Sequence, residues 1–245
     1  MIIIKSPEEI AIMRQCGKIL AAILDELRME VKPGIKTCQL DKIMAKESQR
    51  WGVKPSFKNY RGFPANLCVS VNDEVVHGIP GERILKEGDI VSLDLGVSYN
   101  SFHTDAAITV GVGKVSAQAR ELIAVTEGSL RVGIAQANCG AHVENISTAI
   151  QNYVESRGFS VVREYTGHGV GRELHEEPQV PNFAFSKGPL LRKGMTLAIE
   201  PMVNAGDWRT RLAPNQWTVL TVDGSLSAHF EHTIAITDGE AEILA

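Results

Sequence analysis

An approximate internal repeat is the feature of this sequence that most restricts its fold. Residues 85–94 (LKEGDIVSLD) return in degenerate form as residues 191–200 (LRKGMTLAIE), and residues 105–110 (DAAITV) resemble residues 231–236 (EHTIAI). A repeat of two units indicates pseudo-twofold symmetry, because a solenoid needs three or more units for stability. The chain is therefore expected to fold as two related halves with equivalent strands.

The length of the chain favours one domain built from these halves, about residues 1–112 and 113–245. A chain of 245 residues lies near the upper end for a single hydrophobic core, and no linker or low-complexity segment divides it. Apolar residues make up 44% and charged residues 22%, which is the composition of an ordinary soluble globular protein. We expect a single catalytic domain over residues 1–245, and a monomer.

Charge and cysteine content exclude several classes of protein. The 25 basic and 29 acidic residues give a net charge of −4, and no basic run could follow a phosphate backbone, so no nucleic-acid substrate is expected. The apolar start MIII is interrupted by Lys5 and forms neither a signal peptide nor a membrane span. The four cysteines are scattered, which argues against a disulfide framework. The sequence predicts a cytoplasmic protein without a membrane partner.

Capping signals predict four helices, two in each half. Ser6, followed by a proline and two acidic residues, is typical of a helix start. Thr37 begins a second helix that ends before Gly52, since glycine commonly follows a helix end. Ser116 and a start near Ala141 open the counterparts in the second half.

Each half also contains two segments with the pattern of strands. They are residues 90–97 and 105–110 in the first half, and residues 197–203 and 232–237 in the second. A polar turn at residues 98–101 joins the first pair. The connection in the second pair, residues 204–227, is rich in loop residues and long enough to be functional.

The repeated segments carry four acidic residues, Asp94 with Asp105 in one half and Glu200 with Glu231 in the other. Four carboxylates on adjoining strands repel one another unless cations are present, and two divalent ions would balance their charge. A two-metal site generates hydroxide at neutral pH and polarises a carbonyl group, so hydrolysis of an amide or ester is the expected reaction. The alternative is that these acids cap turns or pair with arginines at the surface.

Histidines supply further candidate ligands. His168 and His175 lie in the segment GHGVGRELHEEPQV. Carboxylate and imidazole ligands together suit Mn, Fe, Co or Zn better than Ca. Strand alternation places His103 and His229 on the same faces as the acids two residues further along, so periodicity makes both of them candidates as well.

Five motifs follow one another along the chain. They are NDEVVHGIP at residues 72–80, the pair Asp94 and Asp105, GHGVGRELHEEPQV at residues 167–180, IEPMVNAG at residues 199–206 and FEHTIAIT at residues 230–237. In this order they resemble the type I methionine aminopeptidases of the bacterial kind over nearly the whole chain, and five ordered motifs are far more specific than one short pattern. The resemblance implies the α+β pita-bread fold, a curved antiparallel sheet flanked by helices.

The resemblance implies a site with two divalent metal ions per chain, drawn from Co, Mn, Fe, Zn and Ni. The implied ligands are Asp94, Asp105, His168, Glu200 and Glu231. In the family pattern Asp105 and Glu231 bridge the two ions. His168 and Glu200 bind one ion, and Asp94 binds the other. The two further histidines that periodicity selects are not ligands in the family.

Substrate contacts are also implied by the resemblance. His175 would hydrogen-bond the scissile carbonyl or the developing oxyanion, His77 would hold the peptide beyond its first residue, and Glu200 would act as a proton shuttle. The implied pocket for the methionine side chain consists of Tyr60, Phe63, Cys68 and Trp217. Aromatic walls and a thiol suit an unbranched thioether.

Two positions depart from the family pattern. Leu174 stands where an aromatic residue often precedes the second histidine, and Phe57 replaces what is often a small residue. Both changes affect the shape of the pocket rather than the chemistry. A misfit of one methylene is worth only about 1–3 kcal/mol, so a preference for methionine is expected to survive.

The function implied is removal of the N-terminal methionine from nascent proteins and peptides, preferentially when the second residue is small. Nascent N-termini would be the partners, with a transient ribosome contact. Proline-specific enzymes of the same fold are the runner-up, but they usually carry an additional N-terminal domain, and only about ninety residues precede Asp94. A non-catalytic peptide-binding relative is the other alternative, and it would be expected to have lost ligands.

Overall fold

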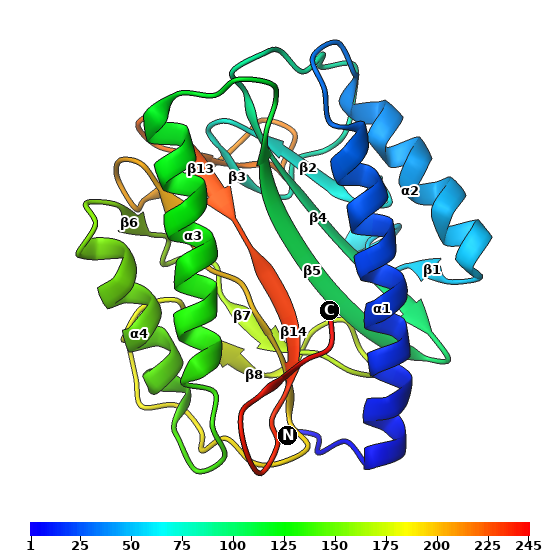
Figure 1. The fold of residues 1–245 in the computed structure, drawn as a ribbon, viewed down its shortest axis with the longest axis vertical. Helices are drawn as coiled ribbons and strands as arrows, with labels where there is room; N and C mark the ends of the chain where they lie inside the picture. The colour runs from blue at the N-terminus through cyan, green and yellow to red at the C-terminus, as the bar shows by residue number, and fades with distance from the viewer.

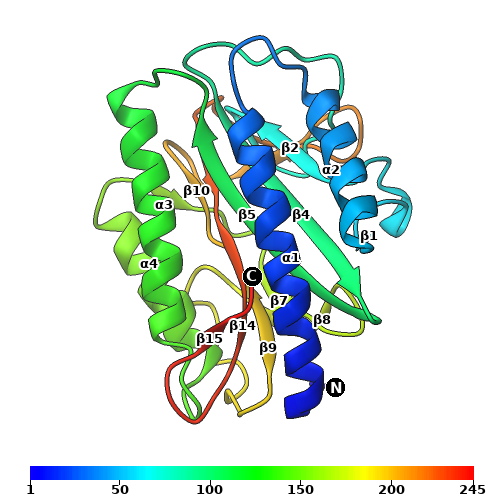
Figure 2. The same ribbon diagram turned by 45° about the vertical axis from the view of Figure 1, so that its right-hand side comes forward.

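The computed structural model describes all 245 residues. Four helices cover one face of a large antiparallel sheet (Figure 1). The helices are α1 (Pro7–Glu30), α2 (Thr37–Trp51), α3 (Ala117–Ala135) and α4 (Val143–Glu155), with a short 3₁₀ helix at Tyr60–Gly62. The pair α1 and α2 lies over one half of the sheet, and α3 and α4 lie over the other (Figure 2). None of these helices combines the length and the apolar character needed to cross a membrane.

The predicted capping signals account for the helix ends. The Ser6 side chain accepts a hydrogen bond from the N–H of Glu9 (3.3 Å), and the Glu9 carboxylate accepts one from the N–H of Ser6 (2.9 Å), which is a capping box. Gly52 follows α2 in the left-handed conformation, and Ser116 caps α3. The fourth helix begins at Val143, two residues after the predicted start.

The main sheet has nine strands in the order β1-β4-β5-β14-β9-β7-β8, with β15 on β14 and β2 on β4. These strands are β1 (Lys54–Pro55), β2 (Cys68–Val71), β4 (Ile90–Tyr99), β5 (Phe102–Gly111), β7 (Gly167–Gly169), β8 (Glu176–Val180), β9 (Thr196–Ile199), β14 (Glu231–Ala235) and β15 (Glu242–Ile243). All their pairings are antiparallel.

Two small sheets stand beside the main one, in the orders β13-β10-β6 and β11-β12-β3. Their strands are β3 (Glu74–Val76), β6 (Ser160–Val161), β10 (Met202–Asn204), β11 (Thr210–Leu212), β12 (Val219–Thr221) and β13 (Ser227–His229). The second of these sheets joins the first half of the chain to the connection at residues 204–227, because β12 pairs with β3.

The internal repeat appears in the sheet as a pseudo-twofold arrangement. The repeated segments form β4 and β5 in the first half, and β9 and β14 in the second, and each pair is antiparallel. The two pairs meet where β5 pairs with β14 in the middle of the sheet. The expectation of two related halves with equivalent strands is therefore confirmed.

Two details of the strand prediction were wrong. The turn at residues 98–101 is shorter than predicted, because β4 and β5 remain paired up to Tyr99 and Phe102. Only Asn100 and Ser101 lie between them, both with positive φ (47° and 65°), as a tight two-residue hairpin requires. The ladder thus continues through residues whose polar side chains suggested a turn.

The segment predicted as one strand at residues 197–203 is divided into two. Strand β9 ends at Ile199, and β10 begins at Met202 in a different sheet. Pro201 has no N–H for a ladder, which explains the break beside Glu200. The connection at 204–227, predicted to be mostly loop, contains β11, β12 and the beginning of β13.

Side-chain alternation in the central strands separates the core from the site. Leu93 and Leu95 of β4, and Ala106 of β5, belong to the apolar cluster formed with α1 and α2. Asp94 and Asp105 alternate with these residues, so they point to the face of the sheet away from the helices. The same rule applies in the second half, where the apolar residues of β9 and β14 pack against α3 and α4.

Candidate metal centre and substrate pocket

Three carboxylates gather at the centre of the sheet because of its strand register. Ala107 of β5 pairs with Asp94 of β4 on one side and with Glu231 of β14 on the other. Asp105 lies two residues before Ala107 and therefore on the same face. The small methyl group of Ala107 leaves room between the carboxylates. All three acids are buried, with exposed fractions of 2–8%.

His168 and Glu200 lie on the adjoining strands of the second half. The Nδ1 of His168 lies 2.8 Å from the carbonyl oxygen of Gly169, so this nitrogen carries the proton and donates it. The Nε2 atom is then unprotonated, so its lone pair is available for coordination. It lies 3.5 Å from Oε1 of Glu200. Asn182 donates a hydrogen bond to the backbone carbonyl of Glu200 (2.9 Å), at the end of β9.

This group of side chains fits a divalent metal. Ligand atoms of Asp105, His168 and Glu231 lie within 4.8 Å of one another. One carboxylate oxygen each of Asp94, Asp105 and Glu231 is buried without a hydrogen-bond partner. Buried carboxylate oxygens are normally paired or bound to a metal, so these three atoms are suited to coordinate one. Oxygen donors with one imidazole nitrogen match Mn, Fe, Co or Zn.

Electrostatics also favour bound cations. Burial raises the pKa of Asp94 to about 7. Burial, followed by repulsion from the neighbouring carboxylates, raises the pKa of Asp105, Glu200 and Glu231 well above the ordinary range. Burial lowers the pKa of His168 to about 4, so its imidazole is neutral at pH 7. All four carboxylates can be ionised together only if positive charge is supplied between them.

The raised pKa values predict how the stability of metal-stripped protein changes with pH. A carboxyl group whose folded pKa exceeds its unfolded value of about 4 binds more protons when folded, so the free energy of unfolding falls as pH rises between the two values. Histidines with a lowered pKa, such as His168, act in the opposite direction, and their effect fades as the pH rises past the unfolded value of about 6.5. The melting temperature is therefore expected to fall from about pH 7 to about pH 8.

Thermal unfolding followed by circular dichroism, with and without saturating manganese, measures this effect. Manganese should remove or reverse the slope, because a divalent cation stabilises the ionised carboxylates and binds only the folded site. A stripped protein whose melting temperature rises over the same pH interval would contradict the raised pKa values of the four acids.

His175 lies at the mouth of the same pocket. Its ring stacks with Tyr60 at a centroid distance of 5.2 Å and lies 4.1 Å from the ring of His168. Its Nδ1 is 3.0 Å from the Tyr60 hydroxyl. Burial, and then the nearby His168 and Arg61, lower the pKa of His175 to about 3. When neutral His175 accepts a hydrogen bond from the Tyr60 hydroxyl at Nδ1, its own proton is on Nε2. That N–H is free to donate a hydrogen bond.

Apolar side chains enclose the pocket above the carboxylates. Phe63 makes edge-to-face contacts with Phe57 (6.4 Å) and with Trp217 (5.2 Å). Cys68 lies opposite Asp94 in the pairing of β2 with β4, and burial, followed by the neighbouring Asp94, raises the pKa of its thiol, which keeps it neutral. The pocket holds about 660 Å³ between the atoms, including its open mouth. Its lining residues are Phe57, Tyr60, Arg61, Phe63, Cys68, His77, Asp94, Asp105, His168, Leu174, His175, Glu200, Trp217 and Glu231.

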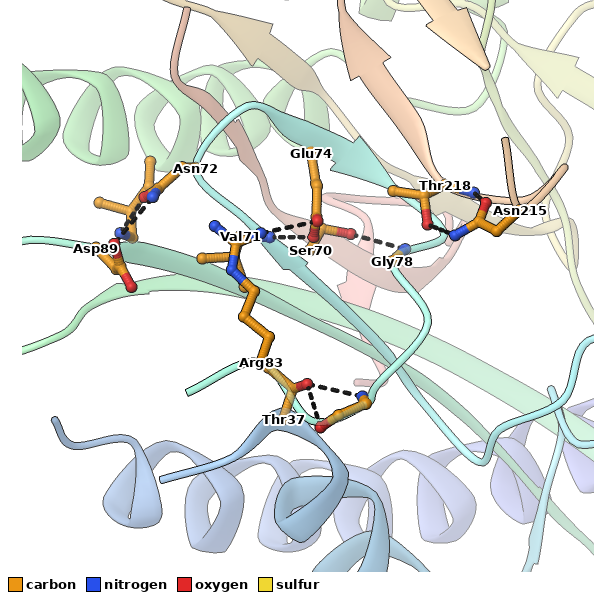
Figure 3. Close-up of polar contacts among 12 residues, drawn as sticks. Thr37, Ser70, Val71, Asn72, Glu74, Gly78, Arg83, Asp89, Asn215 and Thr218 are labelled. Carbon is orange, nitrogen blue, oxygen red and sulfur yellow. Dashed lines mark hydrogen bonds and ion pairs between the residues drawn. The ribbon is translucent and has the colours of Figure 1, made fainter. Parts of the chain in front are cut away.

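His77 enters the pocket from a strained backbone. Its φ is 58°, in the left-handed region that residues with a side chain seldom adopt. The N–H of Gly78 donates to the Ser70 hydroxyl (3.1 Å) (Figure 3). The carbonyl of Gly78 accepts from the N–H of Val69 (2.9 Å). A Cβ atom on Gly78 would lie 2.2 Å from the Val69 carbonyl oxygen, so only glycine fits beside His77.

The structure brings all the residues predicted for the site into this one pocket. The eleven residues are Tyr60, Phe63, Cys68, His77, Asp94, Asp105, His168, His175, Glu200, Trp217 and Glu231. Arg61 also lines the pocket and was not predicted, although it lies between the predicted pocket residues Tyr60 and Phe63.

The two histidines selected by periodicity lie in different places. His103 does not line the pocket, and its Nδ1 lies 2.8 Å from the Ser56 hydroxyl. His229 lies at the edge of the metal centre, with Nε2 3.7 Å from Oε2 of Glu200 and with no hydrogen-bond partner for either ring nitrogen. Neither of them belongs to the group that could hold a metal, Asp105, His168 and Glu231. By position, His229 stands beside Glu200 and stays a candidate, whereas His103 does not line the pocket.

Comparison with known proteins identifies the family. The family model described as metallopeptidase family M24 matches residues 11–238. Methionine aminopeptidase 1 of Bacillus subtilis is 53% identical over 245 residues, covering 100% of this chain and 99% of that protein. The crystal structure of methionine aminopeptidase from Thermotoga maritima matches with a TM-score of 0.98 and 49% identity, over 100% of this chain and 99% of that one.

The chain belongs to the methionine aminopeptidases of family M24. Its fold is the pita-bread fold, as the sequence motifs implied. Prolidase from Pyrococcus furiosus shares this fold with a TM-score of 0.81 at 22% identity. The match covers 99% of this chain and 65% of the prolidase chain. As a methionine aminopeptidase family member, the protein is a metal-dependent hydrolase with a divalent metal cofactor, and its substrates are peptide N-termini.

Proposed function

We propose that the protein removes the N-terminal methionine from nascent proteins and peptides, preferentially when the second residue is small. The observation that carries this proposal is the pocket itself, in which an apolar wall for one side chain stands directly over a group of metal-binding side chains. The 53% identity to Methionine aminopeptidase 1 of Bacillus subtilis supports the same activity. We propose with it a monomer that meets nascent chains in the cytoplasm and contacts the ribosome transiently.

The metal centre is proposed to hold two divalent ions. Asp105 and Glu231 would bridge the ions, His168 and Glu200 would hold one, and Asp94 would hold the other. The orphaned oxygens of three of these carboxylates support this assignment. When bound, a pair of such ions lowers the pKa of a water molecule and polarises a carbonyl group. Co, Mn, Fe, Zn and Ni are all compatible with these ligands, because availability often decides which metal a carboxylate-rich site binds.

The side chains around the centre would position the peptide and move its protons. Glu200 would accept a proton from the attacking water and deliver it to the leaving amine. His175 would donate from Nε2 to the carbonyl oxygen on which negative charge develops, since its Nδ1 is engaged by Tyr60. His77 would hold the peptide beyond its first residue. Binding of the free α-amine at the metal centre would restrict cleavage to the first peptide bond, which would make the enzyme an exopeptidase.

The apolar wall would select the first side chain. Phe63, Cys68 and Trp217 offer a flat, soft surface that suits the flexible thioether of methionine. The two departures from the family pattern, Phe57 and Leu174, belong to the same apolar cluster and are 9% and 2% exposed. They change the outline of the wall without adding polar groups, so selectivity among methionine, leucine and norleucine is the property that they would alter.

A proline-specific activity is the second candidate, because prolidases share the fold. The test is an assay after chelation and return of manganese that compares a peptide starting Met-Ala with one starting Gly-Pro. We expect no cleavage after chelation, and restored cleavage of the Met-Ala peptide after manganese is returned. Cleavage of the Gly-Pro peptide alone would overturn the proposal, and binding of either peptide without cleavage would favour the non-catalytic alternative.

A further inference from the structure

The turn that carries Trp217 is organised by one side chain, Asn215. Its Oδ1 accepts hydrogen bonds from the backbone N–H groups of Trp217 (3.0 Å) and Thr218 (2.9 Å). Its Nδ2 donates to the hydroxyl of Thr218 (2.8 Å) (Figure 3). One amide thus satisfies three polar groups of the turn, which is a common use of asparagine in turns.

The conformation that Asn215 stabilises is strained. Gln216 lies between Asn215 and Trp217 with a φ of 63°, in the left-handed region. A residue with a side chain pays about 1–3 kcal/mol in such a conformation and stays there only when its surroundings fix it. The side chain of Gln216 is exposed and makes no hydrogen bond. Two backbone bonds brace the turn, from the N–H of Gln216 to the carbonyl of Ala213 (3.0 Å) and from the N–H of Ala213 to the carbonyl of Thr218 (2.8 Å). The Asn215 side chain adds its two bonds to the N–H groups that follow Gln216.

The same turn is connected to His77. The buried hydroxyl of Thr218 accepts the hydrogen bond from Nδ2 of Asn215. It donates a long hydrogen bond (3.4 Å) to the carbonyl of His77. His77 has a positive φ of its own, so this carbonyl belongs to a second strained residue. The pairing of Val219 with Val76 keeps the two segments side by side.

The two strained residues stand beside the walls of the substrate pocket. Trp217 follows Gln216 directly, and its indole makes edge-to-face contacts with Phe63 (5.2 Å) and His77 (6.5 Å). Trp217 and His77 both line the pocket, whereas Asn215 and Thr218 do not. Asn215 therefore acts on the pocket only through residues that it holds in place.

We propose that Asn215 is a positioning residue for the substrate pocket: it places the first-residue wall directly through Trp217 and, by way of the Thr218 hydroxyl, it places His77, which would hold the peptide beyond that residue. The inference rests on the proposed function for the identity of the substrate, and on the hydrogen bonds and ring contacts of this turn for the geometry. If these bonds are lost, Gln216 can relax to a negative φ, and the indole of Trp217 moves away from the first side chain of the substrate.

The test compares Asn215→Ala with Asn215→Asp. Alanine removes all three contacts. Aspartate keeps the acceptor for the two backbone N–H groups, but replaces the donor to Thr218 with a second acceptor. We expect Asn215→Ala to raise KM for a Met-Ala peptide about tenfold or more, with kcat changed by less than about threefold, because the defect lies in binding geometry rather than in the chemistry. Asn215→Asp should recover most of the loss.

Tryptophan fluorescence reports the position of the indole without any substrate. In a background with Trp51→Phe and Trp208→Phe, which removes the two tryptophans outside the pocket, Trp217 is the only emitter. Asn215→Ala should shift its emission to longer wavelength as the ring becomes more exposed, and Asn215→Asp should leave the emission near that of the parent. Unchanged KM and unchanged emission in Asn215→Ala would overturn the proposal, as would a fall in kcat at constant KM.

A second pair of variants tests the connection to His77 and does not depend on Asn215→Ala folding. Thr218→Val removes the hydroxyl but keeps the branched shape, and should raise KM for the peptide without shifting the Trp217 emission. Thr218→Ser restores the hydroxyl and should restore KM. Equal KM for the two variants would refute the connection. If the parent enzyme fails to cleave the Met-Ala peptide, the proposed function fails, and the emission shift of Asn215→Ala still decides whether Asn215 positions Trp217.

Discussion

Replacing Asp105 by Asn and Glu231 by Gln in one protein is expected to abolish metal uptake and, with it, peptide cleavage. Ligand atoms of these two side chains and of His168 all lie within 4.8 Å of one another. Each of the two carboxylates also has a buried oxygen without a hydrogen-bond partner. A neutral amide is a poor ligand for a divalent ion and supplies no charge to balance it. Changes beside metal ligands already cost about 10–100-fold in affinity, so losing two ligands should cost more.

The measurement is metal content by mass spectrometry after dialysis of manganese-loaded protein. The parent should retain the proposed two ions per chain, and the double variant should retain none. The variant should stay folded, because removing two buried carboxylates relieves the repulsion that raises their pKa. Its melting temperature without metal should therefore be at least that of the stripped parent.

A control with the same change of charge is available at Glu173, in the loop before β8, and at Glu177, in β8 itself. Glu173 and Glu177 are exposed and do not line the pocket, so Glu173→Gln with Glu177→Gln removes two carboxylates without touching the centre. This control should keep both its metal and its activity. Full metal content in the Asp105→Asn, Glu231→Gln variant would show that the ions bind elsewhere in the protein.

The second large effect is expected for Glu200→Gln, which should lower kcat by about 10²–10⁴ at saturating manganese. The carboxylate of Glu200 lies between two imidazoles, with Oε1 3.5 Å from Nε2 of His168 and Oε2 3.7 Å from Nε2 of His229. The backbone hydrogen bond from Asn182 holds the residue at this position. Glutamine has the same shape but cannot accept the proton of an attacking water at neutral pH.

Glu200 is also a proposed ligand, so loss of the proton acceptor must be separated from loss of metal. Metal content of Glu200→Gln is measured under the assay conditions, and kcat is compared only for fully loaded protein. KM should change little if the variant affects mainly the transition state. An unchanged kcat in fully loaded Glu200→Gln would remove Glu200 from the proposed proton transfer.

Local patterns predicted the elements of the fold well where they depended on neighbouring residues. The capping box at Ser6 and the glycine after α2 are contacts within a few residues, so the chain encodes them directly. The strand boundaries were less accurate. The ladder between β4 and β5 extends to Tyr99 and Phe102 because pairing with a partner strand outweighs the preference of polar residues for turns.

The ligand candidates could be predicted because the repeat and the strand alternation both pointed to the same acids. Alternation says which face a side chain is on, but it does not say how close it lies to side chains of another strand. His103 and His229 share their faces with Asp105 and Glu231, yet His103 bonds Ser56 outside the pocket. The distance between side chains on different strands depends on strand register and strand order. Local periodicity carries no information on either.

The sequence by itself determined that the chain folds as two related halves, which residues face the site, and which chemistry these residues favour, because repeats, periodicity and side-chain type are properties of the chain. The tertiary structure alone decided how the pocket is closed. The connection from Asn215 through Thr218 to His77 joins segments more than a hundred residues apart. Contacts of this kind arise when β12 pairs with β3, and no pattern within either segment specifies that pairing.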